Sequence, residues 1–339
     1  MRQEAITSPM NNPMSSYTIQ SLLAVPSTVE KHIRKQLLGE YLHVGQTYLI
    51  THDSEMVTAA IATQYFTALE ELIAGKPFAY VLGKQSFWQH EFLVNQHTLI
   101  PRPDTERLIE AVLNHHRNSL SKPMNILDLG TGSGCIAITL AEEFKNSYVS
   151  AVDKSPEALK VATQNAKRIG VNNIAFFEGS WYEPFMTTNA DENNKFDIIV
   201  SNPPYIDPND RHLAGLTDEP IGALIADNKG MADICHIVKT APQFLQPHGL
   251  LAIEHGYNQG EQVRDVFLSN GFDEVITVKD YGDNERVTLG VLGRVPNSEQ
   301  SIFNGLKMPK SGKTALNCLT IFQYYLHNLP CFAGDLVYF

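Results

Sequence analysis

The sequence predicts an α/β fold: a Rossmann-like sheet of seven strands with an antiparallel edge strand, preceded by a small all-helical domain. Three observations carry this prediction. Residues 16–75 repeat their apolar side chains with a helical period. After Pro123, short apolar runs alternate with helical segments, which is typical of βαβ units around a parallel sheet. The last two apolar runs follow one another with no helix between them, so they should pair antiparallel at one edge.

The N-terminal part of the chain is expected to start as a disordered tail and to continue as a helical domain. Residues 1–15 are polar and interrupted by prolines and asparagines. Residues 16–82 should then form about four or five helices, with Val29, Ile33 and Leu37 on one helical face. Nothing in this segment indicates chemistry of its own, so we expect a substrate-docking domain.

The remaining chain is divided into a linker, the sheet and a tail. Residues 83–98 are predicted to be a hairpin linker, because SFWQHEFLV at 86–94 reads as a strand or hairpin. Residues 99–294 hold the sheet. Residues 295–339 have no sustained period and form an atypical tail. Its SGKT, Ser311–Thr314, is not a phosphate-binding loop, because Lys307 stands where that motif needs a glycine.

The strands and helices of the sheet domain follow from the apolar runs and their turn signals. Strands are predicted at Asn125–Leu129, Tyr148–Val152, Ile174–Glu178, Phe196–Ser201, Gly249–Glu254, Phe272–Lys279 and Arg286–Leu292. Helices are predicted at Cys135–Phe144, Pro156–Ile169, Met231–Phe244 and Gln259–Asn270.

Composition narrows the function classes without naming one. The 339 residues carry 26 Lys and Arg against 37 Asp and Glu, a net charge of −11, which disfavours a broad nucleic-acid surface. A polar N-terminus and the lack of a long apolar run predict a cytoplasmic protein without a membrane span. The cysteines at 135, 235, 318 and 331 form no C-x-x-C pair, so we expect no disulfide framework and no metal. We also expect a monomer.

A glycine-rich turn follows the first predicted strand of the sheet. Gly130, Thr131, Gly132, Ser133 and Gly134 lead directly into an apolar helix. The glycines let the backbone turn tightly and approach a ligand, and the helix N-terminus offers free N–H groups. A dinucleotide fingerprint would need glycine at the next position, which is a cysteine. Ligand binding is the favoured interpretation, and a purely structural turn is the alternative.

The second strand ends at Asp153, about 20 residues beyond the glycine turn, where a carboxylate can accept both hydroxyls of a ribose. A helix cap is the alternative role. Ser155 followed by Pro156 already provides a good cap for the next helix. We therefore predict that Asp153 binds ribose.

The fourth strand ends in Asn202, Pro203, Pro204 and Tyr205, the sharpest signal in the chain. The prolines fix φ and hold Asn202 at the carboxyl end of the sheet, where open α/β folds bind ligands. The side-chain carbonyl of Asn202 and the backbone carbonyl of Pro203 can accept both hydrogens of a planar NH2 group. The Tyr205 ring can stack over that group.

These motifs resemble those of class I S-adenosylmethionine-dependent methyltransferases. DLGTGSG with an acidic second strand is similar to their cofactor site, and NPPY to members that methylate planar nitrogens. LIPRPDTE, Leu99–Glu106, resembles the signature of the release-factor glutamine N5-methyltransferases (HemK/PrmC family). Further matches are GSWY at 179–182, IEHGYNQ at 253–259 and DYGDNERVTL at 280–289. The resemblance covers about residues 16–294.

The resemblance implies methyl transfer from S-adenosyl-L-methionine to the side-chain amide of a glutamine in a peptide-chain release factor. The target is the glutamine of a GGQ motif, and the reaction tunes translation termination. Gly130–Gly134 would hold the methionine portion, Trp181 would lie beside adenine, and Asn202 would also contact the cofactor. The substrate would be bound by Asn202, Pro203, Pro204 and Tyr205, with Asn202 and Tyr205 catalytic. Arg102 and Glu106 would shape the pocket floor. The segment Ala223–Ala232 departs from the glycine-rich A-L-x-G-G-x-D-G-L usual in the family.

Three alternatives differ in class. An adenine-N6 nucleic-acid methyltransferase uses a similar loop, but the charge of −11 disfavours it. A non-catalytic binding module with the same fold is disfavoured because both motifs are intact. An NAD-linked oxidoreductase fails on Cys135 and has no role for NPPY.

Overall fold

The computed structural model describes residues 16–186, 195–210, 213 and 218–293. The predicted N-terminal tail (1–15), the C-terminal tail (295–339) with its SGKT, and the cysteines at 318 and 331 lie outside the described residues. Within the described part of the chain, every helix is too short or too polar to cross a membrane.

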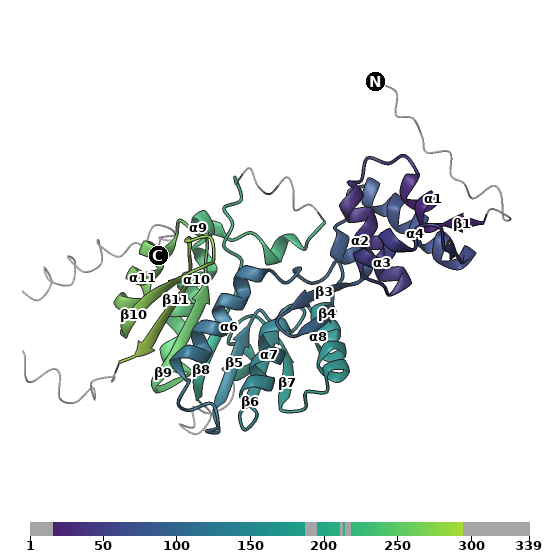
Figure 1. The fold of residues 1–339 in the computed structure, drawn as a ribbon. Helices are drawn as coiled ribbons and strands as arrows, with labels where there is room; N and C mark the ends of the chain where they lie inside the picture. Colours follow the sequence, from purple (N-terminus) through teal and green to yellow (C-terminus); the bar gives the residue numbers. More distant parts are fainter. Residues whose placement is uncertain (1–15, 187–194, 211–212, 214–217, 294–339) are drawn as a thin grey trace, which may run out of the picture.

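The N-terminal domain consists of five short helices around a common core. They are α1 (Ile19–Ala24), α2 (Lys31–Leu42), α3 (Gln46–Thr51), α4 (Ala59–Ile73) and α5 (Phe78–Leu82). Leu22, Leu37, Leu38, Tyr65 and Leu69 are almost fully buried between them. The helical period therefore reflects a real apolar core, and Figure 1 shows these helices at one end of the molecule.

The prediction that this domain is entirely helical is wrong in one detail. Two-residue strands, β1 (Tyr17–Thr18) and β2 (Met56–Val57), pair antiparallel beside the helices. Thr18 is extended because it is the N-cap of α1, where its side chain accepts a hydrogen bond from the Ser21 N–H. A pairing of two residues leaves too little alternation to be visible in the sequence.

A hairpin and an unpredicted helix connect this domain to the sheet. The hairpin joins β3 (Lys84–Phe87) to β4 (His90–Leu93), where the sequence predicts a strand or hairpin. Helix α6 (Pro103–His115) follows. This helix is not among the elements predicted from the sequence. Proline at the first helical position and acidic residues in the first turn are nonetheless start signals for a helix.

The main sheet has seven strands in the order β10-β11-β9-β8-β5-β6-β7. They are β5 (Asn125–Leu129), β6 (Tyr148–Asp153), β7 (Ile174–Glu178), β8 (Phe196–Ser201), β9 (Leu245–Glu254), β10 (Phe272–Lys279) and β11 (Glu285–Leu292). The strands β5 to β9 pair parallel, whereas β11 pairs antiparallel with both β9 and β10. The predicted Rossmann-like fold with its antiparallel edge is confirmed.

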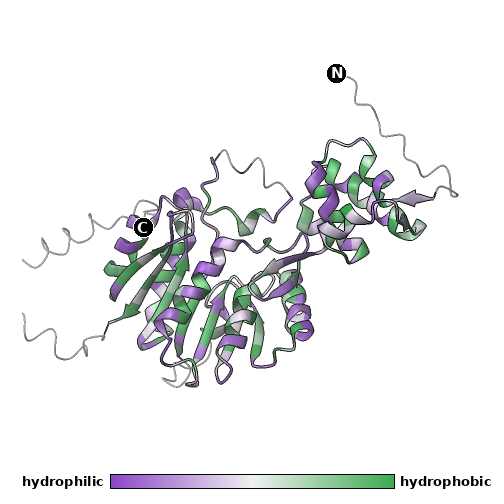
Figure 2. Cartoon of the chain, viewed as in Figure 1, coloured by the Kyte–Doolittle hydropathy of each residue, from purple (hydrophilic) through white to green (hydrophobic). Residues whose placement is uncertain are grey.

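Helices cover both faces of this sheet. Helices α6, α7 (Cys135–Glu143) and α8 (Pro156–Ile169) lie on one face, and α10 (Ala232–Thr240) and α11 (Gly260–Ser269) pack on the other. Successive strand residues alternate between the two cores; for example, Ile126 faces one and Leu127 the other. Figure 2 shows the strands as the most hydrophobic elements, as expected when both faces are buried.

Two predicted boundaries of the sheet domain differ from the structure by four residues, for local reasons, and its other predicted boundaries agree within one residue. Strand β9 begins at Leu245 instead of Gly249, because Leu245 already pairs with Phe196 ahead of a register shift. Helix α10 ends at Thr240 instead of Phe244. Pro242 cannot donate to an α-helical turn, and residues 241–243 form a 3-10 turn.

Candidate active site

A cavity of about 310 Å³ opens at the carboxyl ends of β5, β6 and β8. Six of its lining residues are among the predicted site residues: Gly130, Gly132, Asp153, Trp181, Asn202 and Pro204. The sequence analysis missed the remaining lining residues, which are His97, Leu99, Val152, Lys154, Ser155, Gly179, Ser180, Pro220, Gly222, Ala223 and Asp233. The glycine turn, Asp153 and the NPPY segment are thus brought to one cavity.

Within the glycine turn, the three glycines serve different purposes. Gly130 has φ +77°, and a Cβ on it would lie 3.4 Å from the Trp181 ring, so the indole covers this part of the turn. Gly134 does not line the cavity; a Cβ there would lie 2.9 Å from the side chain of Ile138. Gly132 lines the cavity, and its N–H points to Asp153. The turn therefore presents backbone to the cavity and packs tightly behind it.

Thr131 and Ser133, also predicted to bind the cofactor, are buried and do not line the cavity. The Thr131 hydroxyl donates to the carboxylate of Asp128 at 2.6 Å. Their side chains therefore support the turn from within, and any contact with a ligand would come through their backbone.

Asp153 accepts two backbone hydrogen bonds. Its Oδ2 accepts from the Gly132 N–H at 2.8 Å, and its Oδ1 accepts from the Ser155 N–H at 2.9 Å. Burial raises its pKa, while these donors oppose the rise. Ser155 caps α8 as predicted, through its bond from the Ala158 N–H at 3.2 Å. Asp153 thus braces the glycine turn, and its carboxylate keeps lone pairs for further donors.

The NPPY segment places its four residues at different depths. Asn202 and Pro204 line the cavity, whereas Pro203 is buried and Tyr205 does not line the cavity. The Asn202 side-chain NH2 donates to the Thr105 hydroxyl oxygen at 3.1 Å. With its NH2 engaged in this way, the amide keeps its carbonyl oxygen as the group available to a ligand.

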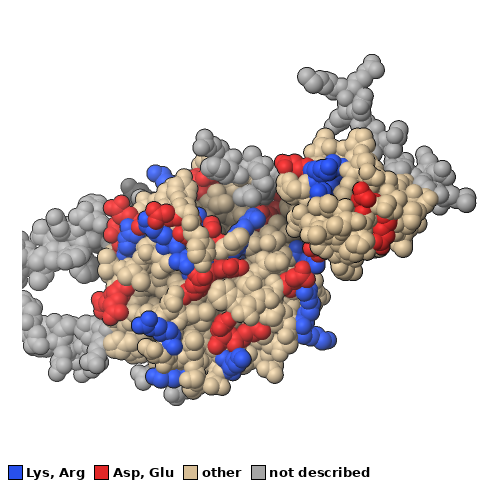
Figure 3. Space-filling model, viewed as in Figure 1, with Lys and Arg blue, Asp and Glu red and all other residues tan. Residues whose placement is uncertain are grey.

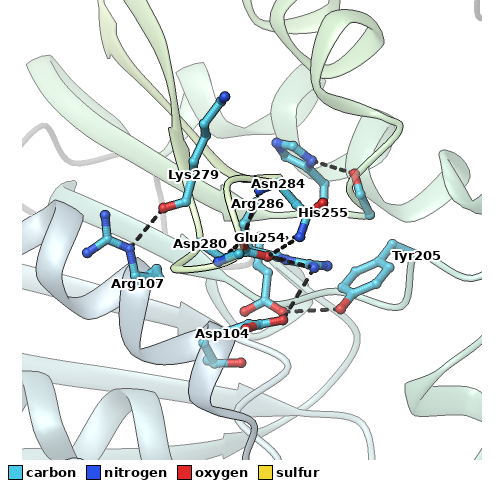
Figure 4. A network of polar contacts seen from close by, with 12 residues as sticks. Asp104, Arg107, Tyr205, Glu254, His255, Lys279, Asp280, Asn284 and Arg286 are labelled. Atoms are coloured by element: carbon cyan, nitrogen blue, oxygen red, sulfur yellow. Dashed lines mark hydrogen bonds and ion pairs between the residues drawn. The ribbon is translucent and has the colours of Figure 1, made fainter.

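Tyr205 is held by a polar network behind the cavity (Figure 4). Its hydroxyl donates to Glu254 Oε1 at 3.2 Å. Burial raises the pKa of Glu254 to about 7 despite the opposing charge of Arg286. The Arg286 guanidinium pairs with Asp280 at 3.0 Å and with Asp104 at 3.3 Å. No spacing in the sequence predicts this network, because its members come from α6, the NPPY segment, β9, β11 and the turn between β10 and β11.

The loop that departs from the family pattern packs against this same segment. Asn228, Lys229 and Gly230 all have left-handed backbone conformations, with φ between +53° and +81°. Glycine and asparagine adopt this region readily, whereas lysine does not. The family glycine is kept at Gly230, while the two that are missing fall at Ala226 and Asp227, outside the left-handed stretch. Gln259 joins the two segments, because its NH2 donates to the carbonyl oxygens of Tyr205 and Lys229 at 3.0 and 3.1 Å.

Two further side chains shape the walls of the cavity. Asp233 interacts with the Trp181 indole N–H and so anchors that ring. Arg102 pairs with the buried Glu219, which also accepts a hydrogen bond from the Ile100 N–H at 3.1 Å. Arg102 is thus adjacent to the wall formed by Pro220 and does not itself line the cavity.

Glu106 lies outside the cavity as well. Its carboxylate accepts a hydrogen bond from the Trp88 N–H at 2.8 Å and so ties α6 to the hairpin. Over the face shown in Figure 3, acidic and basic side chains are interspersed.

Comparisons with known proteins place these features in context. Residues 120–286 match a methyltransferase domain family, and residues 22–83 match the PrmC N-terminal domain family. A release factor glutamine methyltransferase from Aliivibrio fischeri is 42% identical over 80% of this chain and 94% of its own. The Escherichia coli protein of the same name is 41% identical over 73% of this chain and 86% of its own. A methyltransferase structure from Pyrococcus furiosus covers 66% of this chain and 97% of its own at 18% identity, with a TM-score of 0.44.

Proposed function

The chain belongs to the release factor glutamine methyltransferase family, and from this premise we propose how its cavity carries out the reaction. The protein is an enzyme that transfers a methyl group from S-adenosyl-L-methionine to the side-chain amide nitrogen, N5, of a glutamine in a peptide-chain release factor. The GGQ glutamine is the proposed target. Methylation there tunes translation termination.

This proposal rests on one observation: the residues proposed to bind the cofactor and the Asn202 amide proposed to bind the substrate line the same cavity. The Gly130–Gly134 turn and Asp153 form one wall, and Asn202 stands on another with its carbonyl oxygen available. We propose that the turn holds the methionine portion of the cofactor, that Asp153 holds the ribose, and that Trp181 lies beside the adenine. These residues fit such a ligand because the turn offers backbone without a Cβ at Gly130, where a side chain would meet Trp181.

When bound, S-adenosyl-L-methionine supplies an electrophilic methyl group on a sulfonium sulfur. The substrate amide nitrogen is a poor nucleophile, because its lone pair is delocalised into the carbonyl. Asn202 and the Pro203 backbone carbonyl accept its two hydrogens and orient the nitrogen in line with the methyl group. Their partial negative charge lies where positive charge develops. Pro204 lies beside the substrate amide, and Tyr205, behind the cavity, supports this wall through its bond to Glu254.

No strong base is needed before methyl transfer, because the amide proton becomes acidic only once the nitrogen is alkylated. Asn202 and the Pro203 carbonyl lower the barrier by binding the pyramidal nitrogen more strongly than the planar one. This is consistent with a cavity in which His97 is the sole histidine among the described lining residues.

Several finer points belong to the same proposal. The helical domain, residues 16–82, docks the release factor, and residues 83–98 link it to the catalytic domain, residues 99–294. The enzyme acts in the cytoplasm as a monomer and has no direct nucleic-acid partner. The net charge of −11 and the interspersed charges in Figure 3 support a protein substrate over a nucleic acid.

Replacing Asp153 with alanine should weaken cofactor binding. The loss of a charged acceptor for ribose, together with the loss of the brace on Gly132, should raise the Kd for S-adenosyl-L-methionine about 10- to 100-fold. Isothermal titration calorimetry measures this. Asp197→Ala is a matched control, because it removes a carboxylate that accepts a backbone N–H at the opposite end of β8. An unchanged Kd for Asp153→Ala would refute the ribose role.

The substrate class is tested with methyl-labelled S-adenosyl-L-methionine. Purified release factor and duplex DNA are offered separately to the full-length enzyme. Label should enter the release factor and should not enter the DNA. Label in DNA alone would favour the adenine-N6 alternative, and absence of transfer to either substrate would favour the non-catalytic one.

A further inference from the structure

We propose that Thr105 and Glu254 are positioning residues that together orient the Asn202 amide toward the substrate. The inference rests on the proposed function of Asn202 and adds the two groups that fix its direction. Neither residue lines the cavity, and both are almost fully buried behind it, at 2% and 1% exposure.

The orientation of Asn202 depends on which hydrogen bond Thr105 makes. A threonine hydroxyl has one proton and two lone pairs, so it can accept from Asn202 or donate to it. In the structure it accepts from the Asn202 NH2 at 3.1 Å. If Thr105 instead donated its proton to Asn202, the amide would turn its NH2 toward the substrate. A substrate NH2 group would then face donors instead of an acceptor.

Glu254 decides where the Thr105 proton goes. The Thr105 hydroxyl lowers the pKa of Glu254, which places it beside this carboxyl. Among the described residues, Glu254 accepts its side-chain hydrogen bond from Tyr205, at 3.2 Å. Oε2 has no hydrogen-bond partner among the described residues, so this buried oxygen is available to draw the Thr105 proton. The Thr105 lone pair then remains for Asn202. One carboxylate thereby accepts from Tyr205 and, through Thr105, sets the direction of the Asn202 amide.

The charge of Glu254 is governed by groups on three elements. Arg286 on β11 favours the ionised form, whereas burial and Asp104 on α6 disfavour it, and the Tyr205 hydroxyl stabilises it by donating. The resulting pKa is about 7. Only the ionised carboxylate accepts from both hydroxyls, because the protonated form donates its own proton to one of them. The fraction of molecules in which the Asn202 carbonyl oxygen faces the substrate should therefore increase as the pH rises through neutrality.

The first test compares Thr105→Val, which removes the hydroxyl at nearly constant shape, with Thr105→Ser, which keeps it. Methylation of release factor should fall about 10- to 100-fold in kcat for Thr105→Val, with little change in the Kd for S-adenosyl-L-methionine. Thr105→Ser should recover most of the activity. Thr139→Val is the matched control, because it deletes an equally buried hydroxyl that donates only to the Cys135 carbonyl.

A second readout does not depend on turnover. The side-chain NH2 of Asn202 should be protected from hydrogen exchange in NMR spectra of the wild type and Thr105→Ser, and exposed in Thr105→Val. A purely structural role for Thr105 would lower the melting temperature without changing this protection selectively.

The third test is the pH profile. For the wild type, kcat should rise between pH 6 and 8 with a midpoint near 7. In Glu254→Gln, which cannot ionise, the rise should disappear. Identical profiles in the two proteins, or equal kcat for Thr105→Val and Thr105→Ser, would overturn the inference while leaving the proposed function intact. A wild type that fails to methylate release factor would overturn both.

Discussion

Replacing Asn202 with alanine should lower the kcat for release-factor methylation by about 10³-fold or more, to the limit of detection. Binding of S-adenosyl-L-methionine should change little, because we propose that the glycine turn and Asp153 hold most of that ligand. Asn202 has the only side-chain amide among the described residues that line the cavity. Its NH2 is engaged by Thr105, so the substitution removes the amide oxygen that is available to the substrate. The substrate amide then loses the acceptor that orients it and that stabilises positive charge on its nitrogen.

Single-turnover kinetics measures the effect on methyl transfer, and calorimetry measures the effect on S-adenosyl-L-methionine binding. Asn173→Ala is the matched control: Asn173 is equally half-buried, and its NH2 donates to two backbone carbonyls, those of Ala141 and Ser147, away from the cavity. It should keep its kcat while losing some stability. Turnover of Asn202→Ala at the wild-type rate would contradict the proposed role of Asn202 in orienting the substrate amide. A parallel collapse of cofactor binding would instead move Asn202 from the substrate to the cofactor.

Gly230→Ala should have the second-largest effect. A Cβ at this position would lie 2.0 Å from the Tyr205 carbonyl oxygen and 2.8 Å from the Gln259 NH2 nitrogen, distances that neither neighbour can accept without moving. The backbone of the NPPY segment must therefore shift. A displacement of about 1 Å in a positioning group can cost about 10²-fold in rate. We expect a fall of that order in kcat and a loss of about 2 to 4 kcal/mol in unfolding free energy.

The control for backbone strain is Gly271→Ala. Gly271 has φ +83°, close to the +81° of Gly230, but no atom lies within 4 Å of a Cβ built on it. This variant should lose about 1 kcal/mol of stability and keep its kcat. Chemical denaturation and steady-state kinetics on both variants make the comparison. Equal kcat values for the two would show that Gly230 matters only for its conformation and not for its contact with Tyr205.

Much of the sheet could be predicted because its strands are short apolar runs, and the central strands β5 and β8 are buried on both faces. The runs Asn125–Leu129, Ile174–Glu178 and Phe196–Ser201 are apolar enough, and short enough, that their ends coincide with the observed strands. Helix α6 was not predicted, although the proline and the acidic residues of its first turn are signals for a helix start. The strands β1 and β2 were not predicted, because a strand of two residues is too short to show an alternation of apolar and polar side chains.

The cavity was partly predictable for a related reason. Glycines after a strand, an acid at the end of the next strand and a double proline each have local physical consequences, so Gly130, Asp153 and Asn202 could be chosen from sequence alone. Thr105 and Glu254 could not, because they meet Asn202 and Tyr205, respectively, only when α6 and β9 pack against the NPPY segment. Gln259 is similar: its amide joins Tyr205 and Lys229, which precede it by 54 and 30 residues. No spacing rule relates such positions.

The most direct test of the central claim is to locate the transferred methyl group. Release factor is incubated with the full-length enzyme and S-adenosyl-L-methionine, digested, and analysed by tandem mass spectrometry. We predict one added methyl group on the side-chain amide of the GGQ glutamine, absent when the Asn202→Ala enzyme is used. A methyl group on another residue type, or an unmodified release factor alongside labelled nucleic acid, would contradict the account.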